Sequence, residues 1–318
     1  MKKIAFVLPL LAIALTSCSN NSSPISSNVF CYDTMVEIKL YGGNKENIKD
    51  IKNILNVFSN ATDNYAYSTT DGVYSINQTN DEITINSDLY NCLQQSFSFM
   101  SDGASYFNPF CGSLSKKWKE SLEKKEILSS EVINEELTKM NNSSLELKDN
   151  NVVQRTGDAE LDLGGIAKGY VLDLVKDYLA KQEINKYLIN AGSSSILLGE
   201  KDSKDGLFTV GLKDVENAYL KLKNCFVSTS SIYEQGVEIG GVTYSHIINP
   251  NDGSAINEND GVIVISDNGA YGDAMSTSLM NNTIDEIKEI EIEHDIKTIV
   301  IKDKKIAYCN KDIEVSYH

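Results

Sequence analysis

A nine-residue run near the middle of the chain combines an acid, a pair of glycines and a lysine: Asp-Leu-Gly-Gly-Ile-Ala-Lys-Gly-Tyr, residues 162–170. Apolar residues recur at helical spacing over residues 171–180, so we expect the glycines to lie at the N-terminal end of a helix. Such an end offers free backbone N–H groups and the positive pole of the helix dipole, and glycines let an anion approach both. The run therefore favours a phosphate ligand. A glycine pair that only permits a tight turn and close packing is the other open interpretation.

A second run, residues 272–280, places an acid and a hydroxyl four residues apart. Gly272 and Asp273 are typical of a helix start, and Thr277 then lies on the same helical face as Asp273. A carboxylate and a hydroxyl that converge on one point form part of a shell for a hard cation such as Mg²⁺, which takes oxygen ligands and shares them with phosphates. The alternative is an aspartate placed near a helix start for its charge alone.

One histidine stands directly before a turn. His246 precedes the turn-forming sequence Pro-Asn-Asp-Gly at residues 250–253. An imidazole titrates near neutral pH and can take a proton from a hydroxyl nucleophile, whereas a structural histidine would only orient the turn that follows it. The prediction of a catalytic site therefore depends on the three runs together.

The three segments, in this order, resemble the ApbE family, the FAD:protein FMN transferases. In that family a DLGGIAKGY-like run, an NAG run, an HIIDP-like run and a DAxST run follow one another, as they do here at residues 162–170, 190–192, 246–250 and 273–277. The N-terminal half is similar to the family's opening strand, its tyrosine-to-asparagine segment and its aspartate, Gly-Pro-Leu and tryptophan stretch at residues 30–42, 67–77 and 108–118. The resemblance covers about residue 29 to the C-terminus.

The resemblance implies a role for each matching residue. It implies FAD contacts from aromatic, polar and apolar side chains: Tyr32, Tyr67, Tyr106, Phe107, Asn108, Asp162, Lys168 and Ile247. It implies Mg²⁺ ligands in the carboxylate of Asp273, the hydroxyl of Thr277 and the backbone carbonyl of Gly165, where a glycine leaves nothing projecting into the site. His246 would be the general base.

The implied reaction is a Mg²⁺-dependent transfer of the FMN part of FAD onto a threonine or serine hydroxyl of an acceptor flavoprotein, with release of AMP. Family acceptors carry an Asp-Gly-rich motif that ends in Ser or Thr. Residues 102–105, Asp-Gly-Ala-Ser, are only a fragment of that motif, so we expect the acceptor to be another protein. Two alternatives remain: an FAD pyrophosphatase that releases FMN and AMP, and a flavin-binding lipoprotein without catalysis.

The chain departs from the family pattern at several positions. Serines at 193 and 194 stand where the family usually has a further glycine and an aspartate. Asn249 and Asn108 each replace a common aspartate, and Tyr32 replaces a common methionine. The serines put packing or phosphate contacts at that position in question, and none of the departures removes a predicted metal ligand or His246.

The N-terminus has the pattern of a bacterial lipoprotein signal. Two lysines precede an apolar stretch at residues 4–15, which is too short to span a bilayer as a stable helix, and Leu-Thr-Ser-Cys follows at 15–18. We therefore expect a signal peptide at residues 1–17, a lipid on Cys18 and a flexible Ser/Asn-rich tether at 18–28. The predicted location is the extracytoplasmic face of the bacterial cell membrane, with a chance cysteine after an ordinary secretory signal as the alternative.

Composition excludes some classes of partner. The formal net charge of −16 disfavours nucleic acid, and Arg155 is the only arginine, so a phosphate must be held by lysine, backbone N–H groups and metal. Apart from Cys18, five cysteines remain, without the spacing of a zinc site, at positions 31, 92, 111, 225 and 309.

Hydrophobic periodicity predicts an α+β fold, and the resemblance implies a single ApbE-like, T-fold-like two-part domain over residues 29–318 with mixed or antiparallel sheets and flanking helices. Helices are expected at residues 45–60, 88–101, 131–140 and 166–181. Strands are expected at residues 34–41, 73–76, 83–85, 145–147, 151–154, 187–190, 195–198, 208–212, 218–222, 225–229, 262–266, 296–301 and 305–308. A dinucleotide-binding Rossmann fold is disfavoured because the first fingerprint glycine and a clear βαβ unit are absent around residue 164.

Overall fold

A computed structural model describes residues 23–65 and 69–318 of the chain. In these residues the largest element is an antiparallel sheet of eight strands. Its strands, in spatial order, are β1 (Ile25–Cys31), β2 (Thr34–Leu40), β6 (Tyr187–Ala191), β7 (Ser195–Leu198), β10 (Cys225–Ser231), β13 (Gly261–Ser266), β14 (Lys297–Lys302) and β15 (Lys305–Cys309).

Three smaller antiparallel sheets complete the described strands. One contains β16 (Val315–Tyr317), β9 (Ala218–Leu222) and β8 (Phe208–Gly211). A second contains β3 (Glu82–Thr84), β5 (Val152–Thr156) and β4 (Ser144–Lys148), and a two-stranded hairpin contains β11 (Val237–Ile239) and β12 (Val242–Tyr244).

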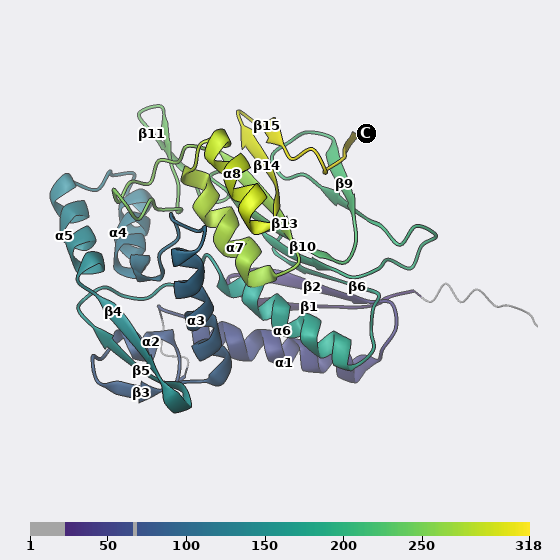
Figure 1. Cartoon of the computed structure of the whole chain (residues 1–318), viewed down its shortest axis with the longest axis horizontal. Helices are drawn as coiled ribbons and strands as arrows, with labels where there is room; N and C mark the ends of the chain where they lie inside the picture. Colours follow the sequence, from purple (N-terminus) through teal and green to yellow (C-terminus); the bar gives the residue numbers. More distant parts are fainter. Residues whose placement is uncertain (1–22, 66–68) are drawn as a thin grey trace, which may run out of the picture.

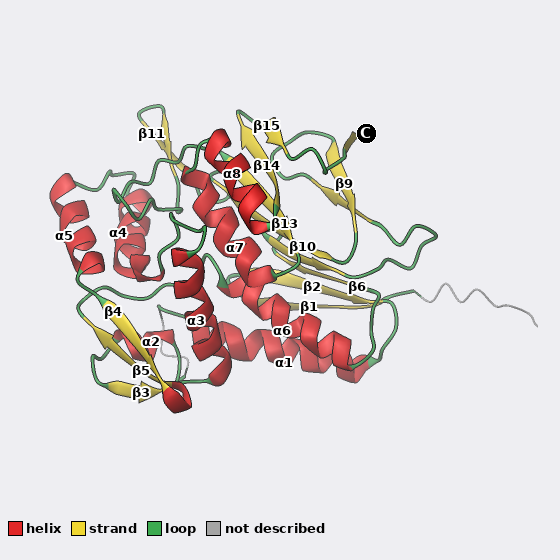
Figure 2. Cartoon of the chain, in the orientation of Figure 1, coloured by secondary structure: helices red, strands yellow, loops and turns green. Residues whose placement is uncertain are grey.

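The helices gather on one side of the large sheet (Figure 1, Figure 2). They are α1 (Lys45–Thr62), α2 (Val73–Asn77), α3 (Ser87–Ser101), α4 (Gly112–Glu123), α5 (Ser130–Asn141), α6 (Ala167–Lys181), α7 (Gly269–Ser278) and α8 (Ile284–His294), with short 3₁₀ turns η1 (Pro109–Cys111), η2 (Asp149–Asn151) and η3 (Leu279–Asn281). Helices α6 and α7 pack against each other and against β7 and β10, and α1 packs against α6.

Alternating side chains give the large sheet two buried faces. In β13, Val262 and Val264 pack into the core under the helices, whereas Ile263 packs into a second core against the β8–β9 sheet. Because side chains alternate between the faces of a strand, one continuous apolar run serves both cores. The main core also includes Val153 of β5, so the small β3–β5–β4 sheet belongs to the same domain.

The α+β prediction is confirmed, and most predicted elements are present with ends shifted by one or two residues. The strand predicted at residues 73–76 is wrong, because this segment forms helix α2. Its β-branched and aromatic residues suggested a strand, but Val73 and Ile76, three residues apart, are both buried on one helical face. The sequence patterns also missed β1, α4, α8, β11, β12 and β16.

The predicted tether is shorter than expected at its C-terminal end. Strand β1 begins at Ile25 and pairs residue by residue with β2, from Ile25 opposite Leu40 to Cys31 opposite Thr34. Residues 25–28 therefore belong to the sheet, because their backbone groups find partners that a free tether would lack. Cys18 and the predicted signal peptide lie outside the described residues, as does Tyr67.

Candidate active site

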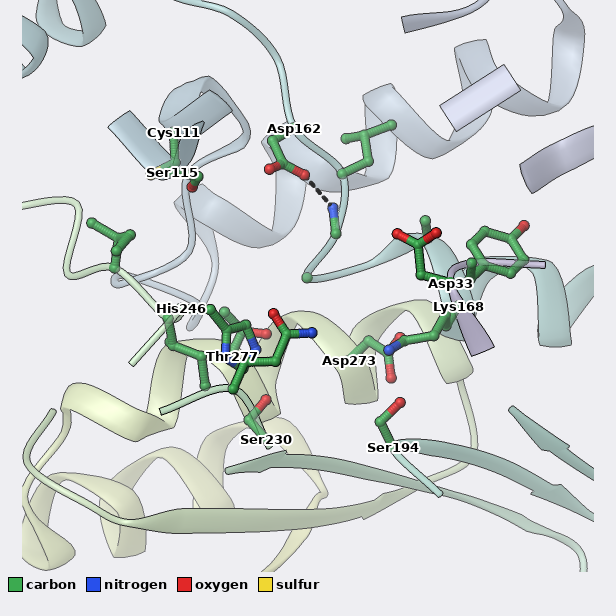
Figure 3. Close-up of a pocket in the computed structure, with 18 of the residues that line it drawn as sticks. Asp33, Cys111, Ser115, Asp162, Lys168, Ser194, Ser230, His246, Asp273 and Thr277 are labelled. Atoms are coloured by element: carbon green, nitrogen blue, oxygen red, sulfur yellow. Dashed lines mark hydrogen bonds between the residues drawn. The ribbon is translucent and has the colours of Figure 1, made fainter. Parts of the chain in front are cut away.

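A large cavity opens where the start of α6, the helix α7 and the ends of β7 and β10 meet. Its volume is about 870 Å³. Every predicted site residue that the structure describes lines it: Tyr32, Tyr106, Phe107, Asn108, Asp162, Gly165, Lys168, His246, Ile247, Asp273 and Thr277. Segments more than 100 residues apart in sequence thus face one shared space (Figure 3).

Two glycines allow α6 and α7 to cross in backbone contact. A Cβ atom added at Gly169 would lie 2.0 Å from the carbonyl oxygen of Gly269, and one added at Gly269 would lie 2.5 Å from that of Gly169. At this crossing the backbone N–H of Gly169 donates to Asp273 Oδ2 at 2.6 Å. The glycine-bearing run and the acidic run are therefore joined directly, as the sequence analysis required.

Asp273 is almost fully buried, with 5% of its surface exposed. The Ser195 hydroxyl donates to its two carboxylate oxygens at 2.8 and 3.1 Å. Burial raises the pKa of Asp273 to about 6, against the opposing effect of Lys168 and of its hydrogen-bond donors. Figure 3 shows the Lys168 amine beside this carboxylate. A buried carboxylate with a raised pKa gains most from a bound cation.

The residues proposed as Mg²⁺ ligands fit the ion by chemistry and position. A Cβ added at Gly165 would lie 3.0 Å from Thr277 Oγ1, so the Gly165 backbone and the Thr277 hydroxyl are neighbours. Asp273 lies one helical turn before Thr277. One carboxylate, one hydroxyl and one carbonyl are the all-oxygen, low-charge donor set that suits Mg²⁺ shared with a phosphate.

Both helix starts differ from the sequence expectation in one detail. Helix α7 begins at Gly269, and the Asn268 side chain caps it by accepting from the Tyr271 N–H at 2.7 Å. Asp273 therefore lies in the second turn and does not act as the cap. At α6, the Gly169 N–H is already bonded to Asp273, so fewer free N–H groups remain for an anion than predicted.

Asp162 is held at the cavity wall by its own backbone. Its N–H donates to the Pro109 carbonyl at 2.8 Å, and its carboxylate accepts from the Gly164 N–H at 2.7 Å. Burial raises the pKa of Asp162, opposed by the Gly164 N–H, the Asn64 side chain and Lys116. The segment before it is fixed by Asn77, whose side chain bonds both the N–H and the carbonyl of Leu161.

Arg155, the only arginine, lies behind this wall and outside the cavity lining. It is 7% exposed and donates to the backbone carbonyls of Ile76, Asn77, Gly157 and Ala159. Burial lowers its pKa. The guanidinium thus ties the end of α2 to the loop that leads to Asp162 and is not available to a phosphate in the cavity.

His246 follows the β11–β12 hairpin, and its neighbours are fixed on both sides. The Ser245 N–H donates to the Ala255 carbonyl at 2.8 Å, and the Ile247 N–H donates to Ser245 Oγ at 3.0 Å. The Trp118 indole, from α4, donates to the carbonyl of Gly253 at 2.8 Å and so anchors the following turn. The side chain of Ile247 is buried and forms part of the wall.

The electrostatic surroundings favour a neutral His246 ring. The side chain of His246 is exposed to solvent where it lines the cavity. Partial desolvation by the surrounding atoms lowers the pKa of the imidazole below the usual 6.5; Glu234 opposes this, while Lys168 and Lys213 add to it. Glu234 also lines the cavity and pairs with Lys213. A neutral imidazole near pH 7 has a free lone pair, as a general base requires.

The predicted flavin-contacting aromatic residues reach the cavity in different ways. Tyr32 sits in the β1–β2 turn with a left-handed backbone (φ 54°), a conformation that costs a non-glycine residue about 1 kcal/mol. Its N–H donates to Ser59 Oγ at 3.1 Å, which helps to hold it there. Phe107 is 4% exposed and packs mostly in the core, whereas Tyr106 and Asn108 are partly exposed beside it.

Several lining residues had escaped the sequence analysis. They include a group of hydroxyl side chains from the strand ends and α7, and four residues from other segments: Ser194, Ser195, Thr229, Ser230 and Ser276, and Asp33, Tyr65, Cys111 and Lys119. A signal for the first group existed: in Phe-Val-Ser-Thr-Ser-Ser of β10, hydroxyl residues continue a buried apolar strand. Polar residues in such a position need partners or a cavity.

Within residues 23–65 and 69–318, no group of three or more His, Cys, Asp and Glu side chains is arranged to hold a metal ion. In the same part of the chain, no helix combines the length and apolar character needed to cross a bilayer. The described cavity lining carries the carboxylates of Asp33, Asp63, Glu123, Asp162, Glu234 and Asp273 but only two lysines, Lys119 and Lys168. An anionic ligand therefore needs additional positive charge to bind here.

A comparison with protein-family models matches residues 32–300 to the ApbE family. This match covers most of the chain, including both helix starts and the His246 turn. The chain belongs to the ApbE family.

Relatives of this ApbE-family chain are described as FAD:protein FMN transferases. The Klebsiella pneumoniae protein is 41% identical over 127 residues, 38% of this chain and 38% of that protein. The Treponema pallidum protein is 26% identical over 217 residues, 62% of this chain and 60% of that protein. The matched region thus spans 38% and 60% of the length of these two relatives, less than two thirds in each case.

The ApbE fold is also evident from solved structures. The ApbE protein of Thermotoga maritima superposes with a TM-score of 0.76, covering 92% of this chain and 96% of that one, at 21% identity. The flavin transferase ApbE of Vibrio cholerae gives a TM-score of 0.73 over 91% of this chain and 97% of that one, at 19% identity. The α+β architecture of this ApbE-family member is therefore that of its structural neighbours.

The structure gives a physical context for one departure from the ApbE pattern. Ser193 has a left-handed backbone (φ 64°) in the β6–β7 turn, at the position where the family usually has glycine. The Asn190 side chain accepts from the Ser193 N–H at 2.8 Å and stabilises the turn. The neighbouring Gly192 could not be replaced by a serine in the same way, because a Cβ there would lie 2.4 Å from Thr34 Oγ1.

Proposed function

We propose that this protein transfers the FMN part of FAD onto a threonine or serine hydroxyl of an acceptor flavoprotein, in a Mg²⁺-dependent reaction that releases AMP. The observation that carries the proposal is the convergence of Gly165, Asp273 and Thr277 on one cavity that His246 also lines. The cavity volume of about 870 Å³ is ample for a dinucleotide-sized ligand. The relatives named FAD:protein FMN transferase support the same reaction class.

In the proposed reaction, Asp273, Thr277 and the Gly165 carbonyl would hold Mg²⁺. The chemistry that the bound ion would supply is positive charge against the diphosphate and the leaving AMP. Lys168 adds a positive point charge to the part of the cavity that contains Asp273. The excess of carboxylates in the cavity supports the need for this cation.

His246 would activate the acceptor. The acceptor oxygen attacks the FMN-side phosphorus while His246 takes the hydroxyl proton. The bond from that phosphorus to the bridging oxygen breaks, and AMP leaves with that oxygen. The product carries FMN through a phosphoester bond. The lowered pKa of His246 supports this role, because it keeps the ring neutral before attack.

The acceptor is proposed to be a different protein that carries an Asp-Gly-rich motif ending in Ser or Thr. Ser105, which ends the motif fragment in this chain, is exposed and is not among the residues that line the cavity. Its neighbour Gly103 packs against the His294 ring instead. An acceptor hydroxyl must therefore enter from outside.

The decisive experiment incubates the chain with FAD, MgCl₂ and an acceptor protein bearing the motif, and then measures the intact mass of the acceptor. An FMN adduct supports the transferase. Free FMN and AMP without an adduct would instead identify an FAD pyrophosphatase, and neither product would identify a flavin-binding protein. Chelation with EDTA and the Asp273→Ala variant should both abolish turnover.

His246→Ala is expected to slow transfer by about a hundredfold or more while FAD binding is retained, because the variant removes the base and leaves the cavity walls intact. FAD binding is measured by flavin fluorescence quenching and transfer by acceptor mass. Transfer at the wild-type rate would rule out His246 as the base.

We further propose that Cys18 carries a lipid that holds the protein on the extracytoplasmic face of the cell membrane. The apolar stretch at residues 4–15 and the Leu-Thr-Ser-Cys sequence support this proposal. Cys18→Ser should move the protein from the membrane to the soluble fraction and remove labelling by a fatty-acid analogue. Membrane retention of the variant would contradict the anchor.

A further inference from the structure

Two buried serines face Asp273 from neighbouring strands. Ser195 of β7 and Ser228 of β10 are directly opposite each other in the antiparallel register. They are 2% and 1% exposed. Opposite residues of such a pair lie side by side on one face of the sheet, so both hydroxyls reach the same point above it. That point is the carboxylate of Asp273.

The Asp273 carboxylate already has several donors. Ser195 Oγ donates at 2.8 Å to Oδ1 and at 3.1 Å to Oδ2, and the Gly169 N–H donates at 2.6 Å to Oδ2. Ser228 lies opposite Ser195 in the sheet, and its hydroxyl lowers the pKa of the Asp273 carboxyl as a nearby donor does. An ionised carboxylate has about four lone-pair positions for donors or metals. With these donors in place, about one lone-pair position of the Asp273 carboxylate remains for a cation.

The number of free positions bears on which cation the site prefers. Ca²⁺ takes six to eight oxygen ligands at about 2.3–2.6 Å and often binds a carboxylate through both oxygens. Mg²⁺ requires about 2.0–2.1 Å in an octahedron and commonly uses one carboxylate oxygen together with waters and phosphates. A carboxylate with one free position therefore favours the smaller ion.

We propose that Ser195 and Ser228 act as positioning residues that restrict Asp273 to one metal bond and so make the site select Mg²⁺ over Ca²⁺. The inference rests on the metal site of the proposed function and deepens it. It concerns two residues that neither the sequence motifs nor the implied ligand set contains. Their hydroxyls set the orientation of the carboxylate about its last torsion, which the helix alone leaves free.

The test is calorimetric titration of the full chain with MgCl₂ and with CaCl₂, without FAD. Wild type should bind Mg²⁺ more tightly than Ca²⁺. Ser195→Ala should lower the ratio of Mg²⁺ to Ca²⁺ affinity about tenfold, the usual scale for a residue that orients a metal ligand. Ser195→Thr, which keeps the hydroxyl, should restore the ratio.

Ser194→Ala is the matched control. Ser194 is the adjacent buried serine, but its hydroxyl donates to the Ala191 carbonyl at 3.2 Å and not to Asp273. This variant should keep the wild-type ratio. If Ser195→Ala fails to fold, as judged by circular dichroism, Ser228→Ala replaces it with the same expectation.

The outcomes separate the two proposals. An unchanged ratio in folded Ser195→Ala and Ser228→Ala, with Mg²⁺ still preferred, would overturn the positioning role and leave the metal site in place. Failure of wild type to bind either cation, both alone and with FAD present, would overturn the metal site itself. An equal loss of ratio in Ser194→Ala would show a general packing effect and also overturn the positioning role.

Discussion

Two carboxylates connect the same pair of helices, one on each side of the Gly169–Gly269 crossing. Asp273 of α7 accepts from the backbone N–H of Gly169 in α6. Conversely, Asp173 of α6 accepts from the N–H groups of Gly269 and Ala270 in α7, each at 2.8 Å. Burial raises the pKa of both acids to about 6.

The two sites differ in what else reaches the carboxylate. Asp273 faces the cavity together with Thr277, Lys168 and the serine hydroxyls. Asp173 does not line the cavity; its nearest opposite charge is Lys176, which is bonded to the carbonyl of Asp267. The same helix-to-helix hydrogen bond therefore serves structure at Asp173 and a candidate metal site at Asp273. Neighbours, and not burial or pKa alone, distinguish a functional carboxylate from a structural one.

The largest effect is expected where both connections fail together. In Gly169→Ala the new methyl group would lie 2.0 Å from the Gly269 carbonyl, so α6 and α7 must separate. We expect a loss of about 3 kcal/mol or more in the free energy of unfolding, together with loss of turnover. Urea denaturation and the acceptor-mass assay measure the two. Wild-type stability would show that the crossing is not tight.

Asp273→Asn should separate function from structure. The amide keeps the shape and can still accept from the Gly169 N–H, but it removes the negative charge that would bind the proposed cation. We expect turnover to fall at least about a hundredfold while the free energy of unfolding, measured by urea denaturation, stays within about 1 kcal/mol of wild type. A variant that is inactive because it is unfolded would contradict this separation.

Asp173→Ala should show the reverse pattern. Two N–H groups at the start of α7 lose their acceptor, and loss of such a helix cap costs about 1–2 kcal/mol. Turnover per folded molecule should change less than about threefold, because Asp173 touches no cavity residue except through the helix pair. Severe loss of activity in a stable variant would mean that Asp173 belongs to the site.

The smallest expected effect is a pH dependence that belongs to Asp173. Its folded-state pKa of about 6 lies above the usual 3.8, so the folded protein holds this proton more tightly. The resulting stability is complete below about pH 4 and is lost as pH rises through about 6. Between about pH 5 and 7 the free energy of unfolding should fall by roughly 1 kcal/mol through Asp173. This contribution to the pH dependence should be absent in Asp173→Asn. Urea denaturation of both proteins at several pH values measures it.

How much of the site was predictable depended on whether its residues are contiguous in sequence. Gly165 and Lys168 lie in one short run, and Asp273 and Thr277 in another, so each run indicated its own chemistry. The meeting of the two runs was a prediction from resemblance alone. The Asp173 connection was not predictable, because an acid at helical spacing reads as a solvated surface residue until its partner helix is placed.

The fold was predicted where periodicity was long and missed where it was short or irregular. The long helices α1 and α6 were found from their apolar spacing. Helix α8 was missed although Thr283 and Glu286 form a capping box, a start signal present in the sequence. Helix α4 has no side-chain cap and depends on burial of Leu114 and Trp118 against the rest of the domain. Such tertiary stabilisation leaves little local signal.

The single arginine, Arg155, allows the opening of strand β5 behind the Asp162 wall of the cavity to be measured. An endoprotease that cleaves only after arginine has one target in the whole polypeptide, the bond after residue 155. That bond is the last one of β5, where both of its residues pair with β4 and the guanidinium is held by four carbonyl groups. Digestion into two fragments should therefore proceed only when β5 opens, so its rate reports how often the support of Asp162 comes apart.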